Sequence, residues 1–168
     1  MSRSEKIEYK PIGIIRSPFK EPAGTPIQPP GGEEIEGVVE IFPEYSDGLK
    51  DIEGFSHLIL IYHFHLSVEA PLHVKPYMDD EPHGVFAMRG PSRPNSIGIS
   101  TVRLNRVEGR ELHIQGIDIV DGTPLLDIKP YMPQFDMRFP ENIGWLEENI
   151  NKLATARDDG RFTGLEGE

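Results

Sequence analysis

The sequence has no cysteine among its 168 residues and only one tryptophan. Without cysteine, disulfide bonds, a catalytic thiolate, zinc sites with cysteine ligands and cysteine-bound iron–sulfur clusters are excluded. Long apolar runs are missing too. The longest, Leu58 to Leu66, contains two histidines and is far shorter than the ~20 residues of a membrane helix. Because the N-terminal MSRSEKIEYK lacks the apolar core of a signal peptide, we expect a cytoplasmic protein that does not engage a membrane.

Basic residues are scarce, since 17 lysines and arginines stand against 28 acidic residues and give a formal net charge of −11. This balance argues against non-specific binding to nucleic acid. The charges are unevenly distributed, however, and residues 89–110 hold a single acid, Glu108, beside a group of arginines. The group consists of Arg89, Arg93, Arg103, Arg106 and Arg110. It forms either a basic strip for a polyanion or an ordinary solvated strand face.

Glycine and proline are abundant, with 17 and 16 copies, and they separate short runs of β-branched and aromatic residues. Many turns between short strands are typical of an all-β barrel or sandwich. The runs that predict strands are residues 7–15, 37–41, 57–66, 84–88, 97–104, 111–117 and 125–128. Gly109 lies between two runs with alternating apolar residues, which predicts a hairpin turn. At ~100 to 200 residues per domain, we expect a single domain.

One helix is predicted near the C-terminus. Pro140 suits a first helical turn, and Asp159 with Gly160 supplies a stop. The apolar residues between these signals recur at helical spacing, and they are Ile143, Leu146, Ile150 and Leu153. Two long irregular stretches, residues 17–36 and 67–82, are rich in proline, and loops of this length in a compact domain are usually functional or disordered.

Three histidines lie in the run FSHLILIYHFH, residues 55–65. On a strand they share one face, and at ~3.3 Å per residue His57 lies roughly 20 Å from His63. His63 and His65 could share a metal ion, and with Glu69 they form H-x-H-x-x-x-E, which resembles part of the cupin metal motif. The glycines of that motif are missing, so a histidine that packs or lines a pocket is the other interpretation.

The segment RGPSRPNSIG, residues 89–98, presents guanidinium and amide side chains from a backbone that two prolines restrict. Arg93 and Asn95 suit a carboxylate, a phosphate or the edge of a nucleobase. The alternative is an ordinary surface loop whose arginines make weak ion pairs.

A third polar segment, DIVDGTPLLDIKPYMPQFD, covers residues 118–136. After its turn signal, Asp127, Lys129 and Tyr131 follow at alternate positions, so on a strand they share one face and could form a row of acid, base and phenol. Signatures of other enzyme classes are missing, namely G-x-G-x-x-G after a strand, the Walker loop, G-x-S-x-G and H-E-x-x-H. A Rossmann-type methyltransferase or dehydrogenase is therefore disfavoured.

Four blocks in order, PIGIIRSPFK, DGLKDIEGFSHLILIYHFH, GVFAMRGPSRPNSIGIS and DIVDGTPLLDIKPYMP, resemble the TsaA-like family. Its characterised members include TrmO, the tRNA N6-threonylcarbamoyladenosine methyltransferases. The resemblance covers residues 11–136 and implies a small, mainly β barrel that binds S-adenosylmethionine without a Rossmann fold. It also implies a homodimer that methylates N6 of threonylcarbamoyladenosine in tRNA and needs no metal. We expect the barrel at residues 7–138, a C-terminal helix and tail at residues 139–168, and no second domain such as many relatives carry.

Matching the blocks residue by residue implies a set of cofactor-binding residues. They are Pro26, Ile27, Gln28, His65, Leu66, Arg89, Asp118, Ile119, Val120 and Asp121. Ile27 stands where many relatives have arginine. Arg93 and Asn95 are the expected substrate-binding residues, because the modified base carries a carboxylate. Its N6 must lose a proton, and we expect Asp127 to accept it while Lys129 and Tyr131 orient or stabilise.

Two other functions stay open on this sequence. One is a non-catalytic or differently directed S-adenosylmethionine-binding module, because the cofactor blocks are better represented than any RNA-binding element and the negative charge opposes association with tRNA. The other is a cupin-like metal enzyme that uses His63, His65 and Glu69.

Overall fold

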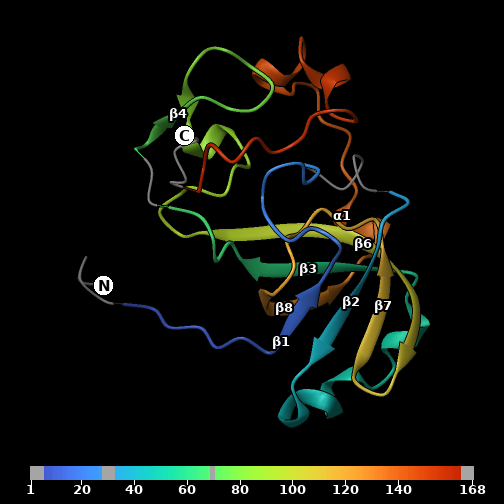
Figure 1. Ribbon diagram of the computed structural model, residues 1–168. Coiled ribbons are helices and arrows are strands. Elements are labelled where there is room, and N and C mark those ends of the chain that lie inside the picture. The colour runs from blue at the N-terminus through green and yellow to red at the C-terminus, as the bar shows by residue number, and fades with distance from the viewer. Residues whose placement is uncertain (1–5, 28–32, 69–70, 164–168) are drawn as a thin grey trace.

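The computed structural model describes residues 6–27, 33–68 and 71–163. Its centre is a closed antiparallel barrel of six strands in the order β1-β2-β7-β6-β3-β8 (Figure 1). These strands are β1 (Gly13–Arg16), β2 (Glu36–Ile41), β3 (His57–His63), β6 (Ile97–Glu108), β7 (Glu111–Gln115) and β8 (Thr123–Pro130). The prediction of a mainly β barrel is confirmed.

The barrel interior is filled by side chains at every second position of its strands. Along β3, Leu58, Leu60 and Tyr62 are buried, while the residues between them face outward. The same alternation buries Leu112 and Ile114 on β7. This period of two is what a strand with one covered face requires, and it explains why the strand pattern could be read from the sequence.

The β6–β7 hairpin turns at Gly109 as predicted, with φ of +60°, a conformation that glycine adopts without steric cost. The predicted strand at residues 84–88 is wrong. There, a two-residue strand β5 (His83–Gly84) pairs with β4 (His73–Val74), and the chain then enters a 3-10 helix at Val85–Ala87. This winding buries Val85 and leaves Phe86 exposed.

The predicted C-terminal helix is not a continuous α-helix. It is replaced by two 3-10 segments, Gly144–Leu146 and Ile150–Lys152. Asn149 explains the difference, because its side-chain Nδ2 donates to the carbonyl of Trp145 while its backbone N–H bonds Leu146. In an α-helix the Trp145 carbonyl would accept that backbone N–H instead.

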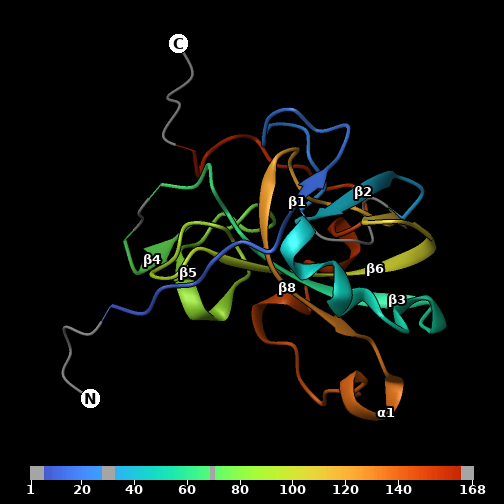
Figure 2. The same ribbon diagram turned by 90° about the horizontal axis from the view of Figure 1, so that it is seen from below.

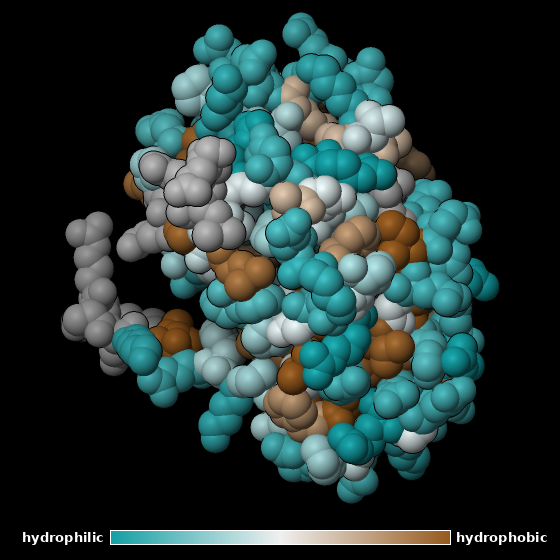
Figure 3. Space-filling view, viewed as in Figure 1, coloured by the Kyte–Doolittle hydropathy of each residue, from teal (hydrophilic) through white to brown (hydrophobic). Residues whose placement is uncertain are grey.

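The remaining helices are short. The α-helix α1 (Pro133–Asp136) stands on a segment that projects away from the barrel (Figure 2), and two further 3-10 helices span Pro43–Leu49 and Ile52–Gly54. Among the described residues, none of the helices has the length and apolar character needed to cross a membrane. Figure 3 shows a mainly hydrophilic face on which apolar residues form small separate groups.

The irregular segments gather at one end of the barrel, above it in Figure 1. The C-terminal segment returns to this end and is held there by an isolated bridge between Pro26 and Arg157. Phe162 is buried in a small second core with Val74 and Met88. Parts of the two irregular stretches and the C-terminal segment, for which the sequence predicted a helix, thus build a cap over the barrel end.

Gly98 on β6 lies under the ring of Tyr62, its partner on β3. A Cβ at this position would overlap that ring, so we predict that Gly98→Ala lowers the free energy of unfolding by roughly 1 to 3 kcal/mol. Gly48→Ala is the matched control, because an added Cβ there meets nothing within 4 Å. Urea unfolding of both variants measures the difference, and equal stabilities would contradict the prediction.

Candidate functional site

A large open cleft lies between the barrel end and the cap, with a volume of about 1170 Å³. Small-molecule sites typically measure ~300 to 1,000 Å³, so this cleft can hold such a ligand together with part of a second one. Its walls come from the ends of β3, β6 and β8, from residues 22–27 and 86–95, and from the C-terminal segment. Both stretches that the sequence marked as irregular contribute to it.

The structure brings most of the expected cofactor residues together in this cleft. Those that line it are Pro26, Ile27, His65, Leu66, Arg89, Asp118, Ile119 and Val120. Gln28 lies outside the described residues. Asp121 lies beside the cleft rather than in its lining, because its carboxylate binds Lys20 Nζ at 2.9 Å and accepts the N–H of Ser17. The expected substrate residues Arg93 and Asn95 also line the cleft.

A chain of polar side chains leads from the barrel interior into the cleft. Ser100 Oγ donates to Asp118 Oδ1 at 2.6 Å and lies 3.0 Å from the hydroxyl of Tyr62. Because the hydroxyl proton of Ser100 is committed to the carboxylate, Tyr62 must donate to Ser100. The chain therefore fixes the carboxylate of Asp118 at the cleft.

Asp118 is the strongly perturbed acid of the cleft. Burial raises its pKa to about 6, against the opposing effects of the hydrogen bond from Ser100 and the charge of Arg89. The pKa of Tyr62 is raised as well, first by its burial and then by the negative charge of Asp118. A carboxyl group that titrates close to neutral pH in a cleft marks a functional site more often than a structural one.

His65 faces the same cleft with a defined tautomer. Thr123 donates its hydroxyl proton to the carbonyl of Val120 at 2.7 Å, and its oxygen lies 3.3 Å from Nδ1 of His65. Nδ1 must therefore carry the proton, which leaves the lone pair on Nε2. Partial burial, and then the neighbouring His63, lower the pKa of His65. The imidazole is thus neutral at pH 7 and can accept a hydrogen bond or a proton.

The backbone of β6 supplies a further wall of the cleft. Residues 97–103 pair with β3, whereas pairing with β7 begins only at Arg103. The N–H of Leu104 bonds Ser56, directly before β3, and the N–H of Phe64 bonds Ser96, so the even-numbered residues of β6 bond β3. The N–H and C=O groups of the odd-numbered Ile99 and Thr101 therefore point to the other side, where no barrel strand pairs with them. Such an open edge can bind the polar edge of a planar ligand.

The arginines of the expected basic strip do not form one surface. Arg89 and Arg93 line the cleft, and Nη1 of Arg93 donates to the carbonyls of Met88 and Gly90, which braces the loop. Arg106 binds Glu108, and Arg110 donates to the carbonyl of Ile41, both at the hairpin end of β6. Arg103, the fifth member of the group, is exposed on β6 between these two pairs.

Asp127, Lys129 and Tyr131 do not line the cleft. Asp127 and Lys129 form an ion pair at 2.7 Å with exposed side chains, and Tyr131 stacks edgewise on His57. A β-bulge explains their position, because the register shifts between Leu125 and Asp127. After this shift Asp127 faces outward, whereas Leu125, two residues earlier, is buried in the core. In a strand without a bulge, both residues would lie on the same face.

One of the three residues of the cupin-like alternative, Glu69, lies outside the described residues. Of the other two, His63 ends β3 with an exposed side chain, whereas His65 lines the cleft. Within the described part of the chain, the group of histidine and acidic side chains close enough to share an ion is a different one, Glu108, Glu111 and His113.

Sequence reasoning missed Tyr62 and Ser100. Both occupy inward positions of strands whose neighbouring inward residues are apolar. A serine at such a position was the available signal, since a buried hydroxyl needs a partner. The cleft walls formed by Trp145 and Phe162 could not be found in this way, because they depend on how the C-terminal segment returns.

Comparison with known proteins identifies close relatives. The family described as tRNA-methyltransferase O N-terminal domain matches residues 14–137. A probable S-adenosyl-L-methionine-binding protein of Pyrococcus abyssi is 63% identical over 157 residues, 94% of this chain and 85% of that protein. A tRNA (adenine(37)-N6)-methyltransferase of mouse is 35% identical over 90% of this chain.

The crystal structure of TrmO from Pseudomonas aeruginosa has a TM-score of 0.69 and 37% identity, and the match covers 84% of this chain. This chain spans 63% of that TrmO chain and 36% of the mouse methyltransferase.

Replacing Asp118 with Asn keeps an acceptor oxygen for Ser100 and removes the titration. The folded protein holds this proton up to pH 6, whereas the ordinary pKa is 3.8. Between these values the wild type should lose stability relative to Asp118→Asn as the pH rises, by roughly 3 kcal/mol in total, with no further change above them. Urea unfolding of both proteins between about pH 4 and 7.5 measures this, and parallel profiles would speak against a raised pKa.

Proposed function

The chain belongs to the TrmO family, and from this we propose that it is an S-adenosylmethionine-dependent methyltransferase that acts on N6 of threonylcarbamoyladenosine in tRNA. The observation that carries the proposal is the meeting of the family's cofactor positions, which come from separate segments of the chain, in one cleft of sufficient volume. We also propose that the protein acts in the cytoplasm, where its tRNA substrate would be met.

The donor set of the cleft fits the groups of S-adenosylmethionine. This cofactor supplies an activated methyl group on a positively charged sulfur, and it carries a carboxylate. Arg89 offers a guanidinium for that carboxylate, while Asp118 offers a negative charge for the cation and an acceptor for hydroxyl groups. The open edge of β6 at Ile99 and Thr101 offers backbone groups for a base edge.

Methyl transfer to N6 also requires a group that takes the proton of the urea-like nitrogen. From the sequence we expect Asp127 in this role, with Lys129 and Tyr131 beside it. In the structure, His65 is the better placed candidate, because it is neutral, its Nε2 keeps a lone pair and the residue lines the cleft. We therefore propose His65 as the base and retain Asp127 as the alternative that the same experiment tests.

Threonylcarbamoyladenosine brings a carboxylate of its own to the site. Arg93 and Asn95 line the cleft, and both backbone bonds of Arg93 are made by Nη1 alone of its guanidinium nitrogens. We propose that these two residues hold the threonine moiety. Phe86, whose side chain is 78% exposed at the cleft, offers a surface on which a base can stack.

We expect the wild type to bind S-adenosylmethionine in a calorimetric titration and to methylate tRNA that bears threonylcarbamoyladenosine. His65→Gln should lower turnover about 100-fold, the usual contribution of a general base, with a smaller effect on cofactor affinity. Asp127→Asn should leave turnover unchanged, because its carboxylate lies outside the cleft. The reverse pattern would return the role to Asp127.

The same calorimetric titration, together with the methylation assay, distinguishes the methyltransferase from the second candidate function, a non-catalytic module that binds S-adenosylmethionine. Relatives from archaea carry names that state only S-adenosyl-L-methionine binding, and the net charge of −11 opposes long-range attraction of tRNA. Cofactor binding without methyl transfer would support a binding module, and the absence of cofactor binding would reject both functions.

We further propose that the protein forms a homodimer through the outer face of β3 and β6. Ile61 and Ile99 are direct partners on these strands and face outward, and Ile97 beside them is 41% exposed. A contiguous apolar patch on a sheet exterior is typical of an interface. The patch borders the cleft, so a second copy seated on it would lie next to the site.

Ile61→Glu should convert the dimer to a monomer, because it places a charge directly beside Ile99 in the apolar patch. Light scattering coupled to size-exclusion chromatography measures the mass of the wild type and the variant. Ile14→Glu on the outer face of β1 is the control and should keep the mass of the wild type. A monomeric wild type, or a dimer that survives Ile61→Glu, would reject this interface.

A further inference from the structure

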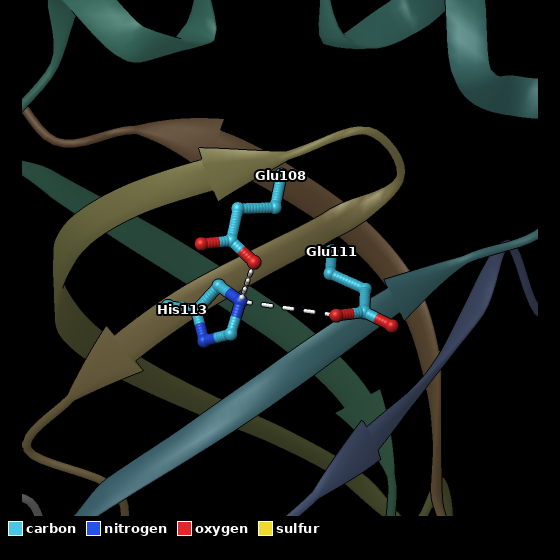
Figure 4. Close-up of side chains that lie close together, drawn as sticks. All are labelled: Glu108, Glu111 and His113. Carbon is cyan, nitrogen blue, oxygen red and sulfur yellow. Dashed lines mark ion pairs between the residues drawn. The ribbon is translucent and has the colours of Figure 1, made fainter.

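Three side chains with metal-binding groups converge on the outer surface of the barrel, at the hairpin end of β6 and β7. They are Glu108, Glu111 and His113, shown in Figure 4. We propose that they form a binding site for a divalent transition-metal ion of the zinc class. The site lies seven residues along β6 from Thr101, or about 23 Å at the rise of a strand, and so is separate from the cleft.

The register of the hairpin creates this arrangement. Glu108 and Glu111 are direct partners across the tight turn, and His113 follows Glu111 on the same face of β7. Leu112 and Ile114, which alternate with them, are buried in the core. The backbone of the three residues is thus held by the barrel, and a site on rigid strands needs little ordering to bind an ion.

The distances between the polar atoms suit a shared ion better than a hydrogen bond. Nε2 of His113 lies 3.4 Å from Oε2 of Glu108 and 3.8 Å from Oε2 of Glu111. Ligand atoms bound to zinc at about 2.0 to 2.2 Å in a tetrahedron lie roughly 3.4 Å apart. Nε2 is moreover a buried polar atom without a hydrogen-bond partner among the described residues, although the whole side chain keeps 18% exposure.

Three carboxylates meet at this cluster, and arginines neutralise two of them. Glu111 stands directly opposite Glu108 on one side and Glu40 on the other, and like charges in such pairs are destabilising. Arg16 neutralises Glu40 at 3.2 Å, and Arg106 binds the other oxygen of Glu108 at 2.7 Å. For Glu111, the basic group given by the structure is His113 itself.

The donor set decides the class of metal. An imidazole nitrogen with two carboxylates suits zinc and its neighbours, whereas calcium and magnesium prefer oxygen ligands throughout. Three protein ligands leave a fourth position for water. Arg106 orients the carboxylate of Glu108, as outer partners of metal ligands commonly do, but its positive charge makes this site weaker than a closed structural zinc site.

The test titrates the full chain, freed of tags and metal, with zinc chloride in a calorimeter. We expect one ion per chain, and Glu111→Gln and His113→Gln should each weaken zinc binding at least tenfold. Two matched controls should bind zinc as the wild type does, namely Glu36→Gln, on the exposed outer face of β2, and His83→Gln, which changes a histidine paired with an acid elsewhere.

Cobalt in place of zinc provides a second readout, because a four-coordinate cobalt site absorbs visible light strongly. The absorption should appear in the wild type and disappear in His113→Gln, while circular dichroism shows that the variant is folded. Absence of zinc binding by the wild type would overturn the proposal. So would binding that is unchanged in both cluster variants, or that is lost on replacing His63 or His83 instead.

Discussion

The structure depends on how the twelve residues of β6 divide their hydrogen bonds between two neighbours. The first half pairs with β3 and the second half with β7, and Arg103 has a partner on both strands. β7 cannot follow β6 further, because the chain turns away at Gly116, where φ is +86° and the N–H bonds the carbonyl of Ile35. The segment that carries Asp118 then crosses the barrel end beside the open edge of β6. The early end of the β6–β7 pairing thus leaves one edge of β6 open and places Asp118 beside it.

The polar chain in the cleft floor follows from the same geometry. Ser100 sits on an inward position of the open half of β6, where it links the phenol of Tyr62 to the carboxylate of Asp118. Burying a carboxyl group costs stability unless its hydrogen bonds are satisfied, and here the raised pKa of Asp118 records an incomplete compensation. An apolar residue in place of Asp118 would make a more stable barrel. The polar group is therefore best understood as part of a ligand site.

The sequence predicted the barrel because each strand alternates clearly, as Leu58 and Leu60 or Leu112 and Ile114 show. It also indicated the cleft, but through resemblance, since residues as distant as Pro26 and Asp118 carry no sign of their contact. It assigned Asp127 to the reacting groups because Asp127, Lys129 and Tyr131 share one strand face, but alternation does not tell which face borders the cleft, and a bulge at Leu126 turns Asp127 outward. The C-terminal helix failed for a related reason. Helical spacing of apolar residues does not reveal that the Asn149 side chain takes the carbonyl of Trp145.

The division of the arginines bears on how an acidic protein can recognise RNA. Arg89 and Arg93 stand at the cleft, while Arg106 and Arg110 lie at the far end of β6 and are engaged by Glu108 and by a backbone carbonyl. Charges further apart than about 8 to 10 Å act nearly independently at physiological salt, and the charge of Arg106 is in addition paired with Glu108. Under the proposed function, the net negative charge of the whole protein repels tRNA at long range. Recognition then rests on close contacts at the cleft, where a carboxylate, a base and two guanidiniums meet.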